Sequence, residues 1–282
     1  MATVIIPSTE AVSAAPRPRK IRWWRGVILL LAFVYFAGPM LVSFLFTVDN
    51  HDQGYSLDAY GQIFSVEGFT QSLLLSLGLG ASTIVLVLLL TLPALLAVRL
   101  GAPRLRPVLE VICTLPLIVP PITFVAGIST VLRWGPDYLA DTPLYQTIIA
   151  IQNPSFPIVL VFAYVILALP FAYRALDAGM AALDVRTLVE AARNLGASWT
   201  HVMLRVIVPN LRSGLASAAF LTLALVLGEF TVAQLLAFRT FPVWIVMISG
   251  ERAQVSVAVS VFSLLLSWLI LLFVSYAGRK RS

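Results

Sequence analysis

Hydrophobic residues gather along this chain in six long stretches that are separated by short polar segments. The stretches cover about residues 26–47, 72–98, 108–132, 158–173, 213–238 and 256–277. A helix of about 20 apolar residues is long enough to cross the roughly 30 Å of hydrocarbon in a bilayer. The pattern therefore predicts an all-α integral membrane protein with six transmembrane helices, in a single membrane domain over residues 26–277.

Composition excludes several other classes of protein. Of the 282 residues, 60% are hydrophobic and only 11% are charged, and the mean hydropathy is +0.95, so a soluble domain is excluded. Cys113 is the single cysteine, and His51 and His201 are the only histidines, so we expect no disulfide within the chain and no metal site. These residues offer no nucleophile, base and orienting acid in one place, and we expect no catalytic residues.

The distribution of basic residues predicts the orientation in the membrane. Sixteen of the 19 Lys and Arg residues fall before the first stretch, after the last, or in the segments that follow the second and fourth. The other three are Arg133, Arg239 and Arg252. By the positive-inside rule the first side is cytoplasmic, which places both termini inside a bacterial inner membrane that the chain crosses several times. The net charge of +6 thus indicates topology and lipid contact rather than nucleic-acid binding.

The two ends are predicted to be basic cytoplasmic tails. Residues 1–25 are polar, contain prolines and end in a cluster of Arg and Lys, which favours a disordered tail, and residues 278–282 form a shorter basic tail. A basic segment before an apolar one could also be a secretory signal. The first stretch is longer than a signal core and lacks a clear small-residue cleavage site, so we predict an uncleaved span.

The segment 182–212, between the fourth and fifth stretches, has the pattern of a helical elbow. Asp184 is placed to cap a short amphipathic helix, and Gly196 to end it in a left-handed conformation. Ser198 would cap a second short helix, and Pro209 would stop that helix by pushing the residue before it toward extended geometry. On spacing alone, an interfacial helix that lies along the lipid headgroups is an open alternative.

The elbow resembles a motif of a known family. Glu190, Ala191 and Ala192, followed by Gly196 and, after a hydrophobic pair, by Pro209, look like the cytoplasmic EAA loop of MetI-like permeases of ATP-binding-cassette (ABC) importers. In that family the loop docks into a groove on the ATPase subunit, so the resemblance implies that these residues couple the chain to an ATPase. The small alanines would permit close helix approach, and the glutamate would offer a charge to the partner.

The resemblance also implies an assembly of several proteins. Six spans would form half of a solute pathway, and the partners would be a cytoplasmic ABC ATPase dimer, a second permease that is related or identical, and an extracytoplasmic solute-binding protein. Lys20 and Lys280 are the only lysines, so the chain has no P-loop, and ATP would be bound by the partner. We therefore expect the chain to be neither an enzyme nor the holder of a cofactor.

Glu229 is the first candidate for the solute pathway or its gate. It lies within the fifth apolar stretch, with Thr231 and Gln234 nearby as further polar residues. An ionisable group inside a membrane is costly and usually faces a cavity or a partner group. It could instead be a buried acid that forms a hydrogen bond with a neighbouring helix.

The prolines of the third stretch are the second candidate. Pro116, Pro120 and Pro121 must bend or interrupt the helix there, either as part of the pathway or as an architectural kink. Glycines in predicted helices are expected to permit close packing of one helix on another. These glycines are Gly127, Gly179, Gly214 and Gly228.

The sequence specifies the solute only loosely. Residues 227–236 and 241–243 look like those of permeases for polyamines, opines, phosphonates, thiamine and ferric iron. The acidic loop between the first two stretches suits a cation, which favours a polyamine such as spermidine or putrescine. Transport of ferric iron, thiamine or phosphonate by the same machinery is an alternative. Another is an ion-coupled secondary transporter that uses Glu229 and needs no ATP, whereas a membrane-embedded enzyme has almost no support.

Overall fold

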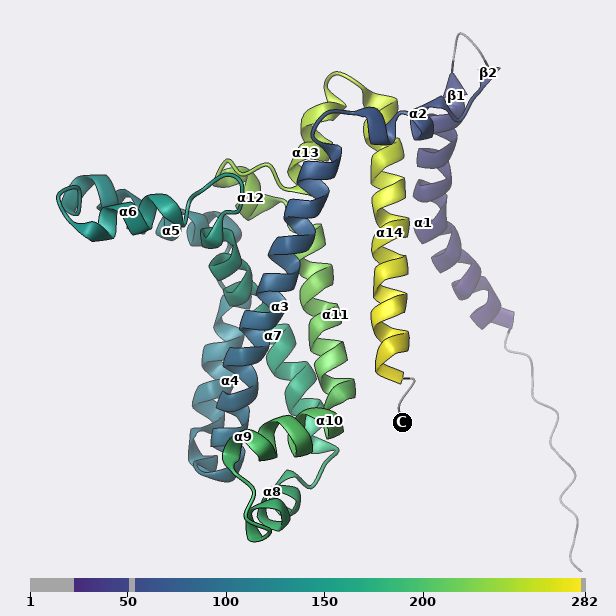
Figure 1. Cartoon of the computed structure of the whole chain (residues 1–282). Helices are drawn as coiled ribbons and strands as arrows, with labels where there is room; N and C mark the ends of the chain where they lie inside the picture. The colour runs from purple at the N-terminus through teal and green to yellow at the C-terminus, as the bar shows by residue number, and fades with distance from the viewer. Residues whose placement is uncertain (1–22, 51–53, 280–282) are drawn as a thin grey trace, which may run out of the picture. The chain divides into compact units, whose positions relative to one another are not determined.

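The computed structural model describes residues 23–50 and 54–279, and nearly all of them are helical (Figure 1). The all-α membrane fold is therefore confirmed. Most of the two predicted tails, residues 1–22 and 280–282, lies outside the described residues. The inner ends of those tails belong to helices instead, because Trp23 begins the first helix and Arg279 ends the last one.

Among the described residues, four helices are long and apolar enough to cross a membrane, and two bent pairs raise the number to six if each pair is one span. The four are Gly26–Val48, Phe69–Leu100, Ile158–Ala181 and Ala253–Ile270. They correspond to the first, second, fourth and sixth predicted spans. The six-span prediction therefore holds only when the third and fifth spans are counted as broken ones.

The chain divides into two compact units, residues 1–42 and 43–282. The boundary falls within α1 (Trp23–Val48), a helix that exposes apolar side chains on nearly every side, as expected of a helix in contact with lipid. In the second unit, the Thr47 and Tyr60 hydroxyls form a 2.9 Å hydrogen bond. The outer elements of that unit are β1 (Asp49–Asn50) and β2 (Gly54–Tyr55), which pair antiparallel, α2 (Asp58–Gly61) and the 3-10 turn η1 (Ile63–Ser65).

Three long helices pack together as the core of the second unit. They are α3 (Phe69–Leu100), α7 (Ile158–Ala181) and α11 (Arg212–Gly228), which run side by side in Figure 1. α14 (Ala253–Arg279) packs against α11. Lipid is as apolar as a leucine side chain, so close packing, rather than removal from water, holds such helices together.

The third predicted span is broken at its prolines, as expected. Its two halves, Pro103–Leu117 and Pro121–Tyr138, are bent by 98°. Pro120 is extended (φ −61°, ψ 141°), as a residue before another proline must be, and Pro121 opens the next helix. The elements of this region are η2 (Pro103–Leu105), α4 (Arg106–Thr114), η3 (Leu115–Leu117), α5 (Pro121–Tyr138) and α6 (Pro143–Ala150).

The prediction of a continuous fifth span to residue 238 is wrong. α11 ends at Gly228, Glu229 is extended (φ −79°, ψ 115°), and two short helices follow, α12 (Thr231–Leu235) and α13 (Phe241–Ser249). The hydrophobic run continues through this region, and hydropathy does not separate a span from short helices that pack against other helices. The chain instead turns at the extended Glu229, and the carboxylate of this residue caps α12.

Between α7 and α11 lie the elements of the elbow, which pack against one another. In Figure 1 they lie at the end of the unit opposite α13. They are α8 (Val185–Asn194), α9 (Trp199–His201), the π-helical turn η4 (Val202–Ile207) and α10 (Val208–Asn210).

Two glycines allow α7 and α11 to approach each other just before and after the elbow. A Cβ atom at Gly179 would lie 2.9 Å from Cδ1 of Leu211 and 3.1 Å from Cα of Gly214. The expected packing role of these two glycines is confirmed. For Gly127 and Gly228 the same expectation is wrong, since no atom of the described residues lies within 4 Å of a Cβ at either position.

We expect Gly179→Ala to destabilise the domain, because the Cβ would press on the backbone of α11, which cannot rotate away as a side chain can. Overpacking of this kind costs about 1–3 kcal/mol. Gly127→Ala is the matched control, and it should be neutral or stabilising by up to about 1 kcal/mol, because alanine is the better helix former in open space. Thermal unfolding midpoints in detergent compare the two, and equal midpoints would contradict the close contact.

Candidate functional site

The first half of the elbow is α8, which begins where the sequence predicts. Asp184 caps it: the carboxylate accepts hydrogen bonds from the Thr187 hydroxyl (2.7 Å) and backbone N–H (3.2 Å). These hydrogen bonds lower the pKa of Asp184 below its ordinary value. The cap is therefore at full strength at neutral pH and weakens only as the pH falls through the lowered pKa.

α8 ends in a left-handed turn at Gly196, as predicted. Gly196 has φ +82°, its N–H donates to the carbonyl of Arg193 (2.9 Å), and the N–H of Ala197 donates to the carbonyl of Ala192 (3.1 Å). This pair of bonds is a Schellman motif. The guanidinium of Arg193 also donates to the Ala197 carbonyl (2.8 Å) and lies 5.3 Å from the ring centre of Trp199. The turn thus determines the direction in which the chain leaves α8.

The second half of the elbow differs from the prediction at its end. The Ser198 hydroxyl accepts from the N–H of His201 (3.3 Å), so that predicted cap is confirmed. Val208 is helical (φ −55°, ψ −47°) rather than extended, and Pro209 lies inside α10. The preceding π-helical turn is wider than an α turn, which gives the proline ring room beside the carbonyls before it. The elbow ends instead at Leu211, where the segments on either side are bent by 78°.

One face of the elbow packs on the membrane domain. Val185, Val189, Val202 and Ile207 are buried within its hydrophobic core, and Ala192 is partly buried against that core. The small side chain of Ala192 lets α8 lie close to its neighbours. This alanine therefore differs from the other predicted coupling residues, because it faces inward.

The opposite face of the elbow is free. Glu190, Ala191, Gly196 and Pro209 are exposed, and Glu190 makes only a long contact with Arg186 (3.8 Å). Large apolar side chains are exposed on the same segment. They are Leu195 (89% exposed), Leu204 (69%) and Trp199 (55%). Helical spacing groups Leu195 with Val189 and Ala192, but Leu195 follows the last residue of α8 and is exposed, whereas Leu204 and Trp199 were not singled out from the sequence.

A cluster of charges joins the end of α3 and the start of α4 to α7. The guanidinium of Arg99 donates to the Asp177 carboxylate (2.6 Å) and to its backbone carbonyl (2.8 Å), and Arg106 donates to the other carboxylate oxygen (3.1 Å). The Arg99 and Asp177 side chains are only about one fifth exposed. Sequence reasoning missed Asp177, because the fourth span was predicted to stop at Tyr173, whereas α7 continues for two more turns to Ala181.

The break in the third span leaves an apolar surface uncovered. Leu117, Ile118 and Ile122 are exposed on either side of the bend. Pro120 and Pro121 are exposed with them, and Pro116 is partly buried in η3. The three prolines therefore lie together at one sharp corner, and their part in a solute pathway stays a prediction.

Glu229 lies at the junction of α11 and α12 rather than within a long helix. Its carboxylate accepts hydrogen bonds from the backbone N–H groups of Val232 (2.8 Å) and Ala233 (3.3 Å). Thr231 and Gln234 are exposed on α12. These three pathway candidates thus lie together: Glu229 is bonded to backbone, and the Thr231 and Gln234 side chains form no hydrogen bond with the part of the chain that the structure describes.

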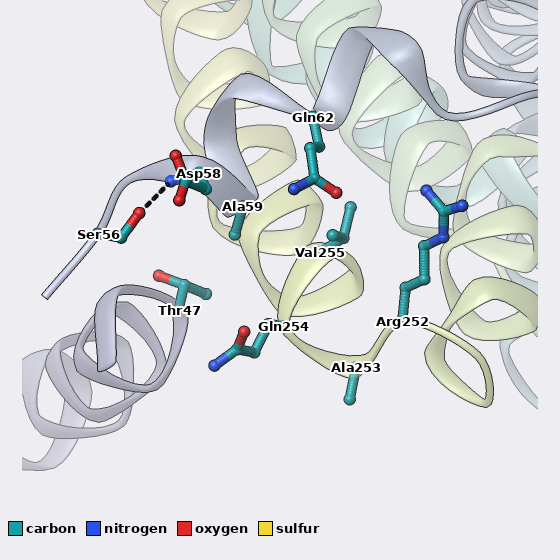
Figure 2. Close-up of a pocket in the computed structure, with 9 residues that line it drawn as sticks. All are labelled: Thr47, Ser56, Asp58, Ala59, Gln62, Arg252, Ala253, Gln254 and Val255. Carbon is teal, nitrogen blue, oxygen red and sulfur yellow. Dashed lines mark hydrogen bonds between the residues drawn. The ribbon is translucent and has the colours of Figure 1, made fainter. Parts of the chain in front are cut away.

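A polar pocket of about 570 Å³ lies at the end of the unit opposite the elbow (Figure 2). Beside it, the Gln254 amide donates to the carbonyl of Asp49 (2.8 Å), and the Ser56 hydroxyl accepts from the N–H of Asp58 (3.0 Å). Such a lining suits contact with water or with a polar partner. The residues around it are Thr47, Ser56, Asp58, Ala59, Gln62, Arg252, Ala253, Gln254 and Val255.

Comparison with known proteins agrees with this arrangement. Residues 89–281 match the family described as "Binding-protein-dependent transport system inner membrane component". The molybdenum transport system permease protein ModB of Mycobacterium bovis is 30% identical over 261 residues, which cover 90% of this chain and 94% of that protein. The putrescine transport system permease protein PotI of Escherichia coli is 25% identical over 217 residues, which cover 74% of this chain and 73% of that protein.

A solved structure shares the fold. It is a bacterial ABC transporter involved in the import of the acidic polysaccharide alginate, with a TM-score of 0.61 and 15% sequence identity. The match covers 92% of this chain and 96% of that one, so the overall fold is a known architecture. The chain is therefore a member of the family of binding-protein-dependent transport system inner membrane components, and it is the permease subunit of an ABC importer.

Proposed function

We propose that this permease forms half of a solute pathway in the bacterial inner membrane and couples to a separate ATPase through its elbow. The observation that carries the proposal is the exposed face of α8 and its Schellman turn. Glu190, Ala191 and Leu195 are free there, while the other face of the helix is held against the membrane domain. A rigid body whose free face carries both charged and apolar side chains is suited to bind a partner and to transmit its movement into α7 and α11.

The proposed orientation places the elbow, α4 and both termini in the cytoplasm. The charge distribution supports it, since the elbow carries four of the 16 basic residues on that side. ATP would then be bound and hydrolysed by the partner dimer, and the chain itself would hold no cofactor. A second permease, identical or related, would complete the pathway, and a binding protein would deliver the solute from outside.

The proposed solute is a polyamine such as putrescine or spermidine. Two observations support it: the similarity to PotI, a putrescine permease by its name, and the acidic side chains outside the membrane in the proposed orientation. Asp49, Asp58, Glu67 and Glu251 belong to this group. A patch of one charge raises the local concentration of an oppositely charged solute.

A molybdenum oxyanion is the second candidate solute. The similarity to ModB favours it, because that match has the higher identity and covers more of the chain than the match to PotI.

Uptake into proteoliposomes tests the function and separates the solutes. The permease is reconstituted with its candidate ATPase, second permease and binding protein, and labelled putrescine and molybdate are offered with and without ATP inside. ATP-dependent uptake of putrescine supports the polyamine, and ATP-dependent uptake of molybdate alone replaces it with the oxyanion. Uptake that is driven by a proton gradient, without ATP or ATPase, would overturn the proposed mechanism.

A further inference from the structure

The junction between α11 and α12 is held by a side chain that reaches past its usual position. A helix is normally capped by the residue just before it, which here is Phe230 and which has no side-chain acceptor. Glu229 stands one residue earlier, and its longer side chain reaches the N–H groups of Val232 (2.8 Å) and Ala233 (3.3 Å) with one oxygen each. Both oxygens of the carboxylate are therefore used by α12.

This cap fixes the position of α12, and with it which side chains of the helix are buried and which are exposed. Val232 and Ala233 are fully buried in the hydrophobic core, and α12 packs against α5 and α7. Thr231 and Gln234, three residues apart and so on one face of the short helix, are exposed. Loss of the cap would free the first turn of α12, and with it the direction of both polar side chains.

A second polar group, the hydroxyl of Tyr164, forms no hydrogen bond with the Glu229 carboxylate in this structure. Tyr164 of α7 is fully buried, and its hydroxyl has no hydrogen-bond partner within the described part of the chain. Tyr164 lies on α7, one of the helices against which α12 packs, and the acidic group that interacts with its hydroxyl is the Glu229 carboxylate. A buried hydroxyl without a partner is costly, which favours a second arrangement in which it donates to this carboxylate.

We infer that Glu229 positions α12 and does not bind the solute, and that Tyr164 is the alternative donor to its carboxylate when α12 moves. The inference rests on the proposed function, because α12 matters for transport only if Thr231 and Gln234 face the pathway. In one arrangement Glu229 caps α12. In the other the carboxylate turns to the Tyr164 hydroxyl and leaves the first turn of α12 free to shift, so α12 has two discrete states.

Thiol labelling tests the positioning role without any transport measurement. Cys113 is the single cysteine, so Cys113→Ser gives a background in which one reporter cysteine is introduced at a time. Val232→Cys reports opening of α12 because the side chain is fully buried, and Gln234→Cys is the exposed control. Glu229→Ala should raise labelling at position 232 about five- to tenfold relative to position 234, as expected when a helix loses its cap.

Glu229→Gln separates a cap from a charge. The glutamine oxygen can still accept from the Val232 N–H, so labelling at position 232 should rise less than about threefold and uptake should stay above half of the unmodified level. The inference is overturned if Glu229→Ala leaves position 232 protected. It is also overturned if Glu229→Gln abolishes uptake while position 232 stays protected, because the charge itself would then meet the solute.

Tyr164→Phe tests the second arrangement. It removes only the hydroxyl, so the capped state should become more populated, labelling at position 232 should fall by about twofold or more, and uptake should slow. Unchanged labelling and uptake would exclude Tyr164 as the alternative donor. If the labelling results hold but no solute is taken up under any condition, the inference about α12 stands and the proposed function fails.

Discussion

Gly196→Val should release the ATPase from this permease while the membrane domain stays folded. Gly196 has φ +82°, and a β-branched residue is strained in that conformation, at a cost of roughly 1–2 kcal/mol or more. Nothing lies within 4 Å of the position of a new Cβ, so the strain falls on the Schellman turn alone. Once the turn opens, Leu195 and Trp199 no longer keep a fixed position relative to Glu190.

Co-purification from detergent measures this effect. We expect about tenfold less ATPase with the valine variant, since a loss of about 1.4 kcal/mol corresponds to that factor. Gly196→Asn is the matched control, because asparagine tolerates positive φ, and it should retain most of the ATPase. The unfolding midpoint of the permease alone should change little in either variant. Full ATPase binding by the valine variant would rule out the elbow as the coupling surface.

The second large effect is expected at Asp177. Asp177→Asn removes the charge that two arginines share and leaves the guanidinium of Arg99, which is only about one fifth exposed, without its ionic partner. Breaking one side of a buried ion pair costs about 3–5 kcal/mol, and the partial exposure here reduces this to roughly 2–4 kcal/mol. We expect the unfolding midpoint to fall by several degrees and uptake to fall with it, because the α3–α4 joint loses its ionic contact with α7.

Arg106→Gln is the control within the same cluster. Its side chain is 55% exposed, and it donates at 3.1 Å to the oxygen that Arg99 does not use. An exposed ion pair contributes only about 0–1 kcal/mol, so this variant should unfold within a few degrees of the unmodified protein. Equal losses in Asp177→Asn and Arg106→Gln would show that the cluster acts through overall charge and not through the buried contact of Arg99.

Local features of the elbow could be predicted from the sequence. A cap depends on a short polar side chain at the right distance from a backbone N–H, and a left-handed turn depends on a glycine, so Asp184, Ser198 and Gly196 are readable from neighbouring residues alone. The π-helical turn is not readable in this way. It arises where the second half of the elbow packs on the domain, and it changes the geometry around Pro209.

Among the candidate pathway residues, too, some features could be predicted from the sequence and others could not. The prolines of the third span predict a break, because they remove backbone donors whatever surrounds them. Glu229 was placed in a continuous fifth span, because hydropathy averages over a window and does not register a side chain that caps the helix after it. Only the three-dimensional structure shows that Glu229 follows the end of α11 and caps α12.

The sequence by itself determined the membrane character, the family resemblance, the elbow and the predicted orientation, because each depends on composition or on residues close together in the chain. Only the tertiary structure decided which helices are broken, which elbow face is free, and that Asp177 joins Arg99 across 78 positions of sequence. The physical reason is that packing between distant segments leaves no periodic signal in either of them. The close approach at Gly179 and Gly214 was expected from residue type, but the structure alone separated it from Gly127 and Gly228.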